Sequence, residues 1–211
     1  GTATSGSDFV AASGSLTFLP GETAKTIAID IKGDSLNELG ETFVVNLANV
    51  VNALPDKSQG IGTIFNNDSL PAIAISDVKS TEGNSGTKSF NFYVNLSAAS
   101  GRPVSVDYAT TNVTASSGSD FAFVSGTLTF SPGQTSKSVV VTVTGDALAE
   151  PDETFQVELS NPSGAVLLDA EGLGTIQNDD TSLRIGHAAL IAGHSGLTEA
   201  SLTLRLSRPA G

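Results

Sequence analysis

The chain has 211 residues, of which 22 are acidic and 10 are basic, so its formal net charge is −12. The absence of cysteine excludes disulfides, thiol catalysis and Cys-ligated metal sites, and the acidic balance argues against binding to nucleic acid. No apolar run approaches the roughly 20 residues that a membrane helix needs, and no signal peptide opens the chain, so we expect no membrane insertion.

The sequence contains internal repeats. The motif Gly6-Ser7-Asp8-Phe9 returns at 118–121, and Glu41-Thr42-Phe43 returns at 153–155, in each case 112 residues later. The pairs keep their order and their spacing along the chain. A unit of about 110 residues therefore repeats along the sequence.

This repeat divides the chain into three predicted parts. Residues 1–70, called the head below, are expected to hold only the C-terminal strands of a unit. Residues 71–180 form one complete unit. Residues 181–211, called the tail, hold the equivalents of its first two strands, because Ala72–Gly101 matches Ser182–Gly211 at a spacing of 110 residues.

Apolar residues alternate with polar ones through the complete unit, which is the period of half-buried β-strands. Phe90, Phe92, Val94 and Leu96 show this alternation, and turn sequences rich in Gly, Asn, Ser and Pro separate the strands. Seven strands are expected near 72–77, 88–96, 103–109, 125–130, 136–144, 154–160 and 173–177. This pattern predicts an antiparallel β-sandwich.

The acidic residues of the complete unit are expected to meet at one end of that sandwich. Consecutive strands alternate in direction, so the loops after the first, third and fifth strands lie at the same end as the end of the seventh. These loops contain no Lys or Arg, whereas the loops of the opposite end (131–135 and 161–172) hold only Asp169 and Glu171. The acids predicted at this end, called the tip below, are Glu82, Asp120, Asp146, Glu150, Glu153, Asp179 and Asp180.

Such a cluster of carboxylates is unfavourable unless a positive charge binds within it. Hard divalent cations with oxygen ligands meet this need, and the set offers enough ligands for roughly one to three Ca²⁺ ions. The alternative is that these acids are ordinary loop residues that remain solvated. For the set as a whole, we favour cation binding.

Five motifs in order carry a resemblance to a known family. They are Thr81-Glu82-Gly83, Gly118-Ser119-Asp120-Phe121, Gly126-Thr127-Leu128-Thr129-Phe130-x-Pro132-Gly133, Gly145-Asp146-x-x-x-Glu150-Pro151-Asp152-Glu153-Thr154-Phe155 and Gly174-Thr175-Ile176-x-Asn178-Asp179-Asp180. Together they resemble the Calx-β domain over the whole unit. The resemblance implies an all-β chain of tandem seven-stranded immunoglobulin-like β-sandwiches, of which the first and last are incomplete.

The resemblance also implies a ligand set. In the Ca²⁺-sensing domains of sodium–calcium exchangers, Ca²⁺ binds at the tip on the acids of these motifs, which correspond to the seven residues named above. Gly145 stands where the sensor domains have another Asp, and Asn178 heads a run that is all Asp there. We therefore expect fewer ions or weaker binding than in the sensors.

The head carries an equivalent acidic set, and the tail departs from it. The head residues predicted as metal ligands are Asp8, Asp34, Glu38, Glu41 and Asp68. Gly40 and Asn67 interrupt this set, and its first-loop Glu has no equivalent within the head. In the tail, Ala192 stands where the complete unit has Glu82, so we expect the third unit to bind less well.

These features predict a calcium-binding structural repeat of a large extracellular or cell-surface protein. Ca²⁺ at the tips would stiffen the joints between units for adhesion or matrix roles, with neighbouring Calx-β repeats as partners and host or matrix surface ligands as further ones. The alternative is a cytosolic Ca²⁺-sensing regulatory domain of an exchanger-like transporter. The ligand losses at Gly145, Asn67 and Ala192 favour the structural role.

Enzymatic activity is not expected. Paired carboxylates can hydrolyse glycosides, but such sites need a cleft and usually aromatic sugar platforms, and the chain has no Trp and 2 Tyr. His187 and His194 need no special role as surface residues.

Head-to-tail association between chains is conceivable, because the tail carries equivalents of the first two strands that the head lacks. Against it, neither end supplies an equivalent of Arg102–Asn112, which includes the third strand.

Overall fold

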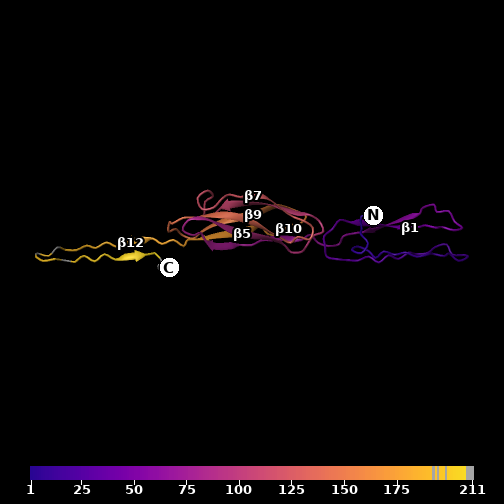
Figure 1. The fold of residues 1–211 in the computed structure, drawn as a ribbon, viewed down its shortest axis with the longest axis horizontal. Coiled ribbons are helices and arrows are strands. Elements are labelled where there is room, and N and C mark those ends of the chain that lie inside the picture. The colour runs from indigo at the N-terminus through magenta and orange to yellow at the C-terminus, as the bar shows by residue number, and fades with distance from the viewer. Residues whose placement is uncertain (192, 194, 198, 208–211) are drawn as a thin grey trace.

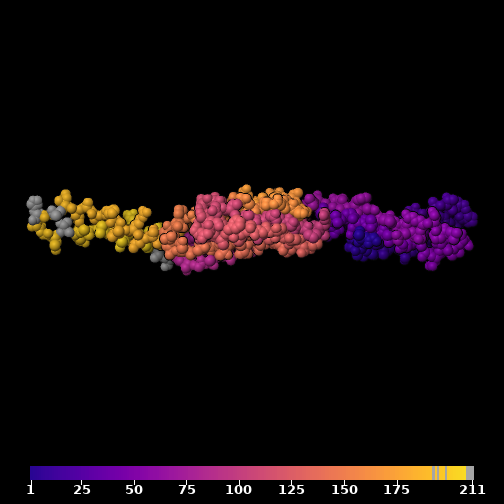
Figure 2. Space-filling model, turned by 90° about the horizontal axis from the view of Figure 1, so that it is seen from above, coloured from indigo at the N-terminus to yellow at the C-terminus, as the bar shows by residue number. Residues whose placement is uncertain are grey.

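The computed structural model describes residues 1–191, 193, 195–197 and 199–207. These residues form thirteen β-strands and no helix, which confirms the all-β prediction. Accordingly, none of the described segments is a helix with the length and apolar character to cross a membrane. The head, the complete unit and the tail follow one another along the longest axis (Figure 1), and together they make a narrow, extended body (Figure 2).

The complete unit is a sandwich of two sheets. Its strands are β3 (Ala72–Ile75), β4 (Val78–Thr81), β5 (Gly86–Leu96), β6 (Val104–Asn112), β7 (Ser125–Phe130), β8 (Ser136–Gly145), β9 (Glu153–Ser163), β10 (Val166–Asp169) and β11 (Glu171–Gln177). One sheet has the order β10-β3-β5-β8 and the other has the order β4-β11-β9-β6-β7. Within each sheet the neighbours are antiparallel, except for β3 with β10 and β4 with β11, which are parallel.

The first strand changes sheet part-way along. The sequence predicts a single strand at 72–77, but the backbone N–H of Ser76 still donates to the carbonyl of Tyr93 on β5 (2.9 Å), whereas the Asp77 carboxylate accepts from the backbone N–H of Leu173 on β11 (2.8 Å). The chain therefore leaves one sheet and enters the other between Ser76 and Asp77. The predicted strand ends early as β3, and a further strand, β4, follows where a loop was expected.

The end of the unit differs from the prediction in the same way. Residues 161–172 are expected to form a loop, but they contain the end of β9, all of β10 and the start of β11. β10 pairs with β3 and β11 pairs with β4, so the last strand, like the first, belongs to both sheets.

The core lies between the two sheets and is built around aromatic rings. Phe90 and Phe92 of β5 are buried, as their alternation predicts. The ring of Phe155 on β9 stacks on Phe121 with centroids 4.4 Å apart and meets the edge of Phe92 at 5.8 Å. Because Phe121 follows Asp120 and Phe155 lies two residues after Glu153, the same packing that stabilises the sandwich also positions these acids.

The head and tail each form one strand pair, in the same register as the complete unit. In the head, β1 (Glu41–Asn46) pairs with β2 (Gln59–Ile64), and Phe43 lies opposite Gly62 as Phe155 lies opposite Gly174. In the tail, β12 (Leu183–Ile185) pairs with β13 (Leu204–Leu206), and Ile185 lies opposite Leu204 as Ile75 lies opposite Val94. The internal repeat of the sequence is therefore a repeat of structure.

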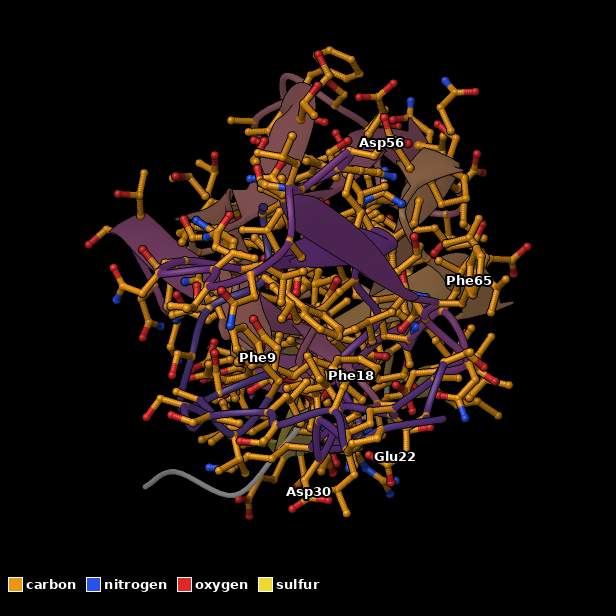
Figure 3. All side chains as sticks on the ribbon, turned by 90° about the vertical axis from the view of Figure 1, so that its right-hand side faces the viewer. Phe9, Phe18, Glu22, Asp30, Asp56 and Phe65 are labelled. Atoms are coloured by element: carbon orange, nitrogen blue, oxygen red, sulfur yellow. The ribbon has the colours of Figure 1, made fainter. Side chains whose placement is uncertain are left out.

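The rest of the head forms few hydrogen-bonded ladders. Its segments 13–18 and 24–33 correspond to β7 and β8, which in the complete unit pair only with β6 and β5. The described head residues contain no equivalents of β5 and β6, so these segments form no strand, and their pairing is limited to the bridge between Ile31 and Phe9. Apolar side chains are exposed as a result, including Phe18 at 53% (Figure 3).

We predict that Phe155→Ala destabilises the protein by about 3–5 kcal/mol, because it removes the ring at the centre of the core. The matched control is Phe123→Ala: Phe123 is 60% exposed, so its loss should change stability by less than about 0.5 kcal/mol. Urea unfolding of both variants measures the difference, and equal losses would contradict this description of the core.

Candidate metal centre

The structure brings the seven predicted tip acids to one end of the complete unit. They lie after β4, in the loop before β7, between β8 and the first residue of β9, and after β11. Because the strand directions alternate, these positions are at the same end of the unit. Two hydrogen bonds join the segments: the N–H of Glu82 donates to the backbone carbonyl of Gln177 (3.2 Å), and the N–H of Gly83 donates to the side-chain carboxylate of Asp179 (3.0 Å).

Three of these acids form the tightest group. Oxygens of Glu82, Asp179 and Asp180 all lie within 4.8 Å of one another. Glu82 is 9% exposed and Asp180 is 2% exposed. The Oδ1 of Asp180 accepts a hydrogen bond from the side-chain amide of Asn84 (2.6 Å), whereas its Oδ2 is buried and has no hydrogen-bond partner. A buried carboxylate oxygen without a partner is costly, and a bound cation would satisfy it.

Burial, together with the neighbouring negative charges, changes the titration of Glu82. Burial raises the pKa of Glu82 to about 7, with further contributions from the charges of Asp146, Asp180, Glu150 and Asp179 in that order. The environment of Glu82 in the folded protein therefore disfavours the charged form of its carboxylate.

The remaining acids of the tip lie beside this group. Burial, followed by the charge and hydrogen bond of Asp120 and then by the charge of Glu150, raises the pKa of Glu153. Because the charge of Glu150 acts on both Glu82 and Glu153, Glu150 connects the two halves of the cluster. The Asp146 carboxylate accepts from the backbone N–H of Leu148 (2.7 Å), which orders the loop that carries Glu150.

The five predicted acids of the head also gather. Oxygens of Asp8, Glu38 and Glu41 lie within 4.8 Å of one another. Burial, then the charges of Asp34, Asp8 and Asp68, raises the pKa of Glu38. All five line one small hollow of about 130 Å³.

Acids of the head outside this set are dispersed. In the end-on view of Figure 3, Glu22 and Asp30 lie on one side of the head and Asp56 lies on the opposite side. Lys25 and Glu22 form an ion pair in the head. Within the described residues, no tip acid of the head or of the complete unit forms an ion pair. The gathering of like charge is therefore confined to the predicted positions.

The two clusters differ in their tightest trio. In the head it is Asp8, Glu38 and Glu41, which correspond to Asp120, Glu150 and Glu153 of the complete unit rather than to Glu82, Asp179 and Asp180. The difference follows from the sequence, because Asn67 replaces Asp179 and the head holds no equivalent of Glu82. The corresponding tail position, Ala192, lies outside the described residues, as does His194.

Two residues of the site are not acids predicted to bind metal. Asn84 holds Asp180, and a side-chain amide in a turn gives little signal in a sequence. Asp152 accepts a hydrogen bond from the backbone N–H of Asn178 (3.3 Å) and so supports the last acidic run. The structure also explains why position 145 is a glycine and not an acid. A Cβ there would lie 2.1 Å from the carbonyl oxygen of Gly83, so no side chain fits beside this turn.

A β-sandwich with a cluster of carboxylates at one tip is the architecture of a cation-binding repeat module. The chain belongs to the Calx-beta domain family, whose model matches residues 1–68 and 72–180. The resemblance is thereby confirmed, and the predicted β-sandwich is the one that the two sheets of the complete unit form.

Relatives with similar sequences belong to larger proteins. The adhesion G-protein coupled receptor V1 of Danio rerio is 30% identical over 200 residues, which cover 83% of this chain and 3% of the receptor. The sodium/calcium exchanger 1 of Bos taurus is 31% identical over 186 residues, which cover 77% of this chain and 19% of the exchanger. The chain thus spans only a small part of the relatives it matches.

Solved structures with a similar fold include a two-domain and a one-domain fragment. The CBD12 region of CALX1.2 is 26% identical and covers 62% of this chain and 56% of its own, with a TM-score of 0.49. The apo-form Calx CBD1 domain is 27% identical and covers 53% of this chain and 100% of its own, with a TM-score of 0.46.

We predict that, in chelator, acidification from pH 8 to pH 6 raises the melting temperature. The pKa of Glu82 lies above its unfolded value, so the folded state binds the proton more tightly and stability falls as the pH rises through about 7. A gain of order 1 kcal/mol corresponds to about 4–8 °C for a domain of this size. Glu82→Gln should flatten the curve, and a melting temperature that falls on acidification would contradict the described burial of Glu82.

Proposed function

We propose that the chain is a calcium-binding structural module of a large extracellular or cell-surface protein, with Ca²⁺ at the tips of its units. The observation that carries the proposal is the buried Oδ2 of Asp180, which lacks a hydrogen-bond partner and lies in the trio with Glu82 and Asp179. A cation is the ligand that relieves both the unpartnered oxygen and the mutual repulsion.

The donor set favours Ca²⁺ over other metals. Every candidate side-chain ligand is a carboxylate, which suits hard cations, and Ca²⁺ accepts 6–8 oxygens in flexible geometry. In the complete unit, Glu82, Asp179 and Asp180 would supply the inner ligands. The proposed ligands in full are Glu82, Asp120, Asp146, Glu150, Glu153, Asp179 and Asp180 in the complete unit, and Asp8, Asp34, Glu38, Glu41 and Asp68 in the head.

The position of the clusters supports a mechanical role. Asp180 is followed by β12 at Leu183, and Asp68 is followed by β3 at Ala72, so each cluster lies where one unit passes into the next. Neutralising the acids there removes the repulsion between loops that meet at the joint. Ca²⁺ would then hold neighbouring units in a fixed orientation, which turns a flexible string into a rod suited to adhesion or matrix roles.

The competing proposal is a cytosolic Ca²⁺-sensing domain of a transporter. The relatives named as sodium/calcium exchangers support it, whereas the relative named as an adhesion receptor supports the surface role. The ligand set of the head is interrupted by Gly40 and Asn67. This favours a structural module, because a Ca²⁺ sensor should have a complete set of acidic ligands. In both cases the proposed role is not enzymatic.

Neighbouring repeats are the proposed partners, together with surface ligands of a host or matrix. The head also has an open apolar groove of about 370 Å³ lined by Ile27, Ile29, Ile31, Phe43 and others, where the equivalent of β5 would lie. The β12–β13 hairpin of a second copy could enter it, but neither part supplies an equivalent of β6. We therefore favour the neighbours within one chain, and light scattering at high concentration distinguishes the two arrangements.

We predict that Ca²⁺ raises the melting temperature of the full chain, and that the double substitution Glu82→Gln with Asp180→Asn abolishes most of this rise. At a free concentration 100-fold above the dissociation constant, the stabilisation is about 2.7 kcal/mol. Calorimetry and thermal melting with Ca²⁺, Mg²⁺ and chelator measure it.

The matched control is Asp169→Asn with Glu171→Gln, since these acids lie at the opposite end of the same unit. This control should keep the whole response to Ca²⁺. The proposal fails if Ca²⁺ neither releases heat nor changes the melting temperature, or if the two double variants respond alike.

A further inference from the structure

The loop between β5 and β6 of the complete unit contacts the acidic loop of the head. Asn37 and Ser100 form a parallel β-bridge across the boundary between the two parts. The carbonyl of Asn37 accepts hydrogen bonds from the backbone N–H of Gly101 (3.2 Å) and from the Ser100 hydroxyl (3.3 Å). The main-chain carbonyl of one head residue thus accepts two hydrogen bonds from the following unit.

Burial distinguishes this contact from a chance approach of two loops. Asn37 is 8% exposed although it lies in a largely exposed acidic loop, and Ser100 is 2% exposed. Both residues are also tied to their own units. The side-chain amide of Asn37 donates to the carbonyl of Asp68 (2.8 Å), and the carbonyl of Ser100 accepts from the backbone N–H of Gly133 (2.9 Å).

Gly101 leaves room for the acidic loop. A Cβ at this position would lie 2.4 Å from Oε1 of Glu38 and 2.5 Å from its Cγ, so the Glu38 side chain lies directly over the glycine. Because the stem of Glu38 is involved and not only its tip, any larger residue at 101 would force the loop to move.

From these contacts we propose that Ser100–Gly101 is a docking surface for the preceding repeat, which reaches it through the main-chain carbonyl of Asn37. The side chain of Asn37 positions that carbonyl, because its amide is bonded to Asp68 within the head. The partner that fits this surface is a Calx-β unit with Asn directly before the Glu equivalent to Glu38. The contact uses neutral hydrogen bonds and no cation, so it forms without Ca²⁺ and limits the movement of this joint, which the proposed Ca²⁺ would stiffen further. This inference therefore does not depend on the proposed function.

The next joint of the chain lacks this residue. The head loop reads Asp34-Ser35-Leu36-Asn37-Glu38, and the equivalent loop reads Asp146-Ala147-Leu148-Ala149-Glu150. Both loops have the same local turn, since the N–H of Leu36 and that of Leu148 each donate to the preceding Asp at 2.7 Å. Ala149 has no side-chain amide to position its carbonyl against Asp180, so we expect the second joint to be held less firmly than the first.

Pulsed electron–electron double resonance can measure the distance between the head and the complete unit. The chain has no cysteine, so spin labels attach only at cysteines that are introduced. Ser13→Cys and Ser138→Cys place exposed labels on the head and on the complete unit. In chelator, the parent chain should give a single distance distribution that is narrower than those of variants without the contact. Asn37→Ala and Gly101→Ala should each widen it about twofold, since units without a fixed contact move freely.

Two controls make the result specific. Ser35→Ala changes an exposed side chain of the same loop that forms no hydrogen bond to the complete unit within the described residues, so its distribution should match the parent. Ser100→Ala leaves the head intact and should widen the distribution even if Asn37→Ala disturbs folding, which circular dichroism would show. A parent distribution that is already broad in chelator, or variants that match it, would overturn the docking contact. The Ca²⁺-dependent melting shift of the parent, read separately, reports on the proposed function alone.

Discussion

Pairing between strands is the constraint on which the rest of this structure depends. A buried backbone must find partners for its N–H and C=O groups, and a strand can form only where a second segment supplies them. The complete unit contains every partner and closes a core around Phe155. The head keeps β1–β2 and the tail keeps β12–β13, in the registers of their counterparts, because only these pairs have both members within the chain's described residues.

The same constraint creates the candidate metal centre. Strand direction, set by pairing, places Glu82 after β4 beside Asp179 and Asp180 after β11, although their charges repel. The hydrophobic core and the hydrogen bonds between strands supply the free energy that holds these carboxylates together. Their mutual repulsion destabilises the tip, and a bound cation would remove this repulsion. Hydrogen bonding within the protein satisfies this carboxylate only in part. The side-chain amide of Asn84 donates to one oxygen of Asp180, and the other oxygen has no hydrogen-bond partner.

Much of the fold could be predicted, because alternation and repeat spacing are properties of the sequence. Phe90 and Phe92 point inward as their period requires, and the tip acids gather as strand parity requires. The change of sheet at Ser76–Asp77 was not predicted: the inward-facing positions shift by one residue there, from Ile73 and Ile75 to Val78, but such a shift is equally typical of a β-bulge, and only the hydrogen-bond partners show the change of sheet. The role of Asn84 and the joint at Asn37 could not be predicted, because they depend on contacts between distant segments. Ligand roles and the boundaries near 70 and 180 remain predictions.

The parallel pairing of the first and last strands has a mechanical consequence. The chain enters the complete unit from the head at β3 and leaves it towards the tail after β11, and these ends lie at opposite ends of the unit (Figure 1). Tension applied along the array would draw β4 and β11 past each other in opposite directions. Their ladder from Val78 to Thr81 would bear this load in shear, with its hydrogen bonds sharing the force instead of parting one at a time. The sandwich is thus built to resist pulling along the direction in which the units are joined.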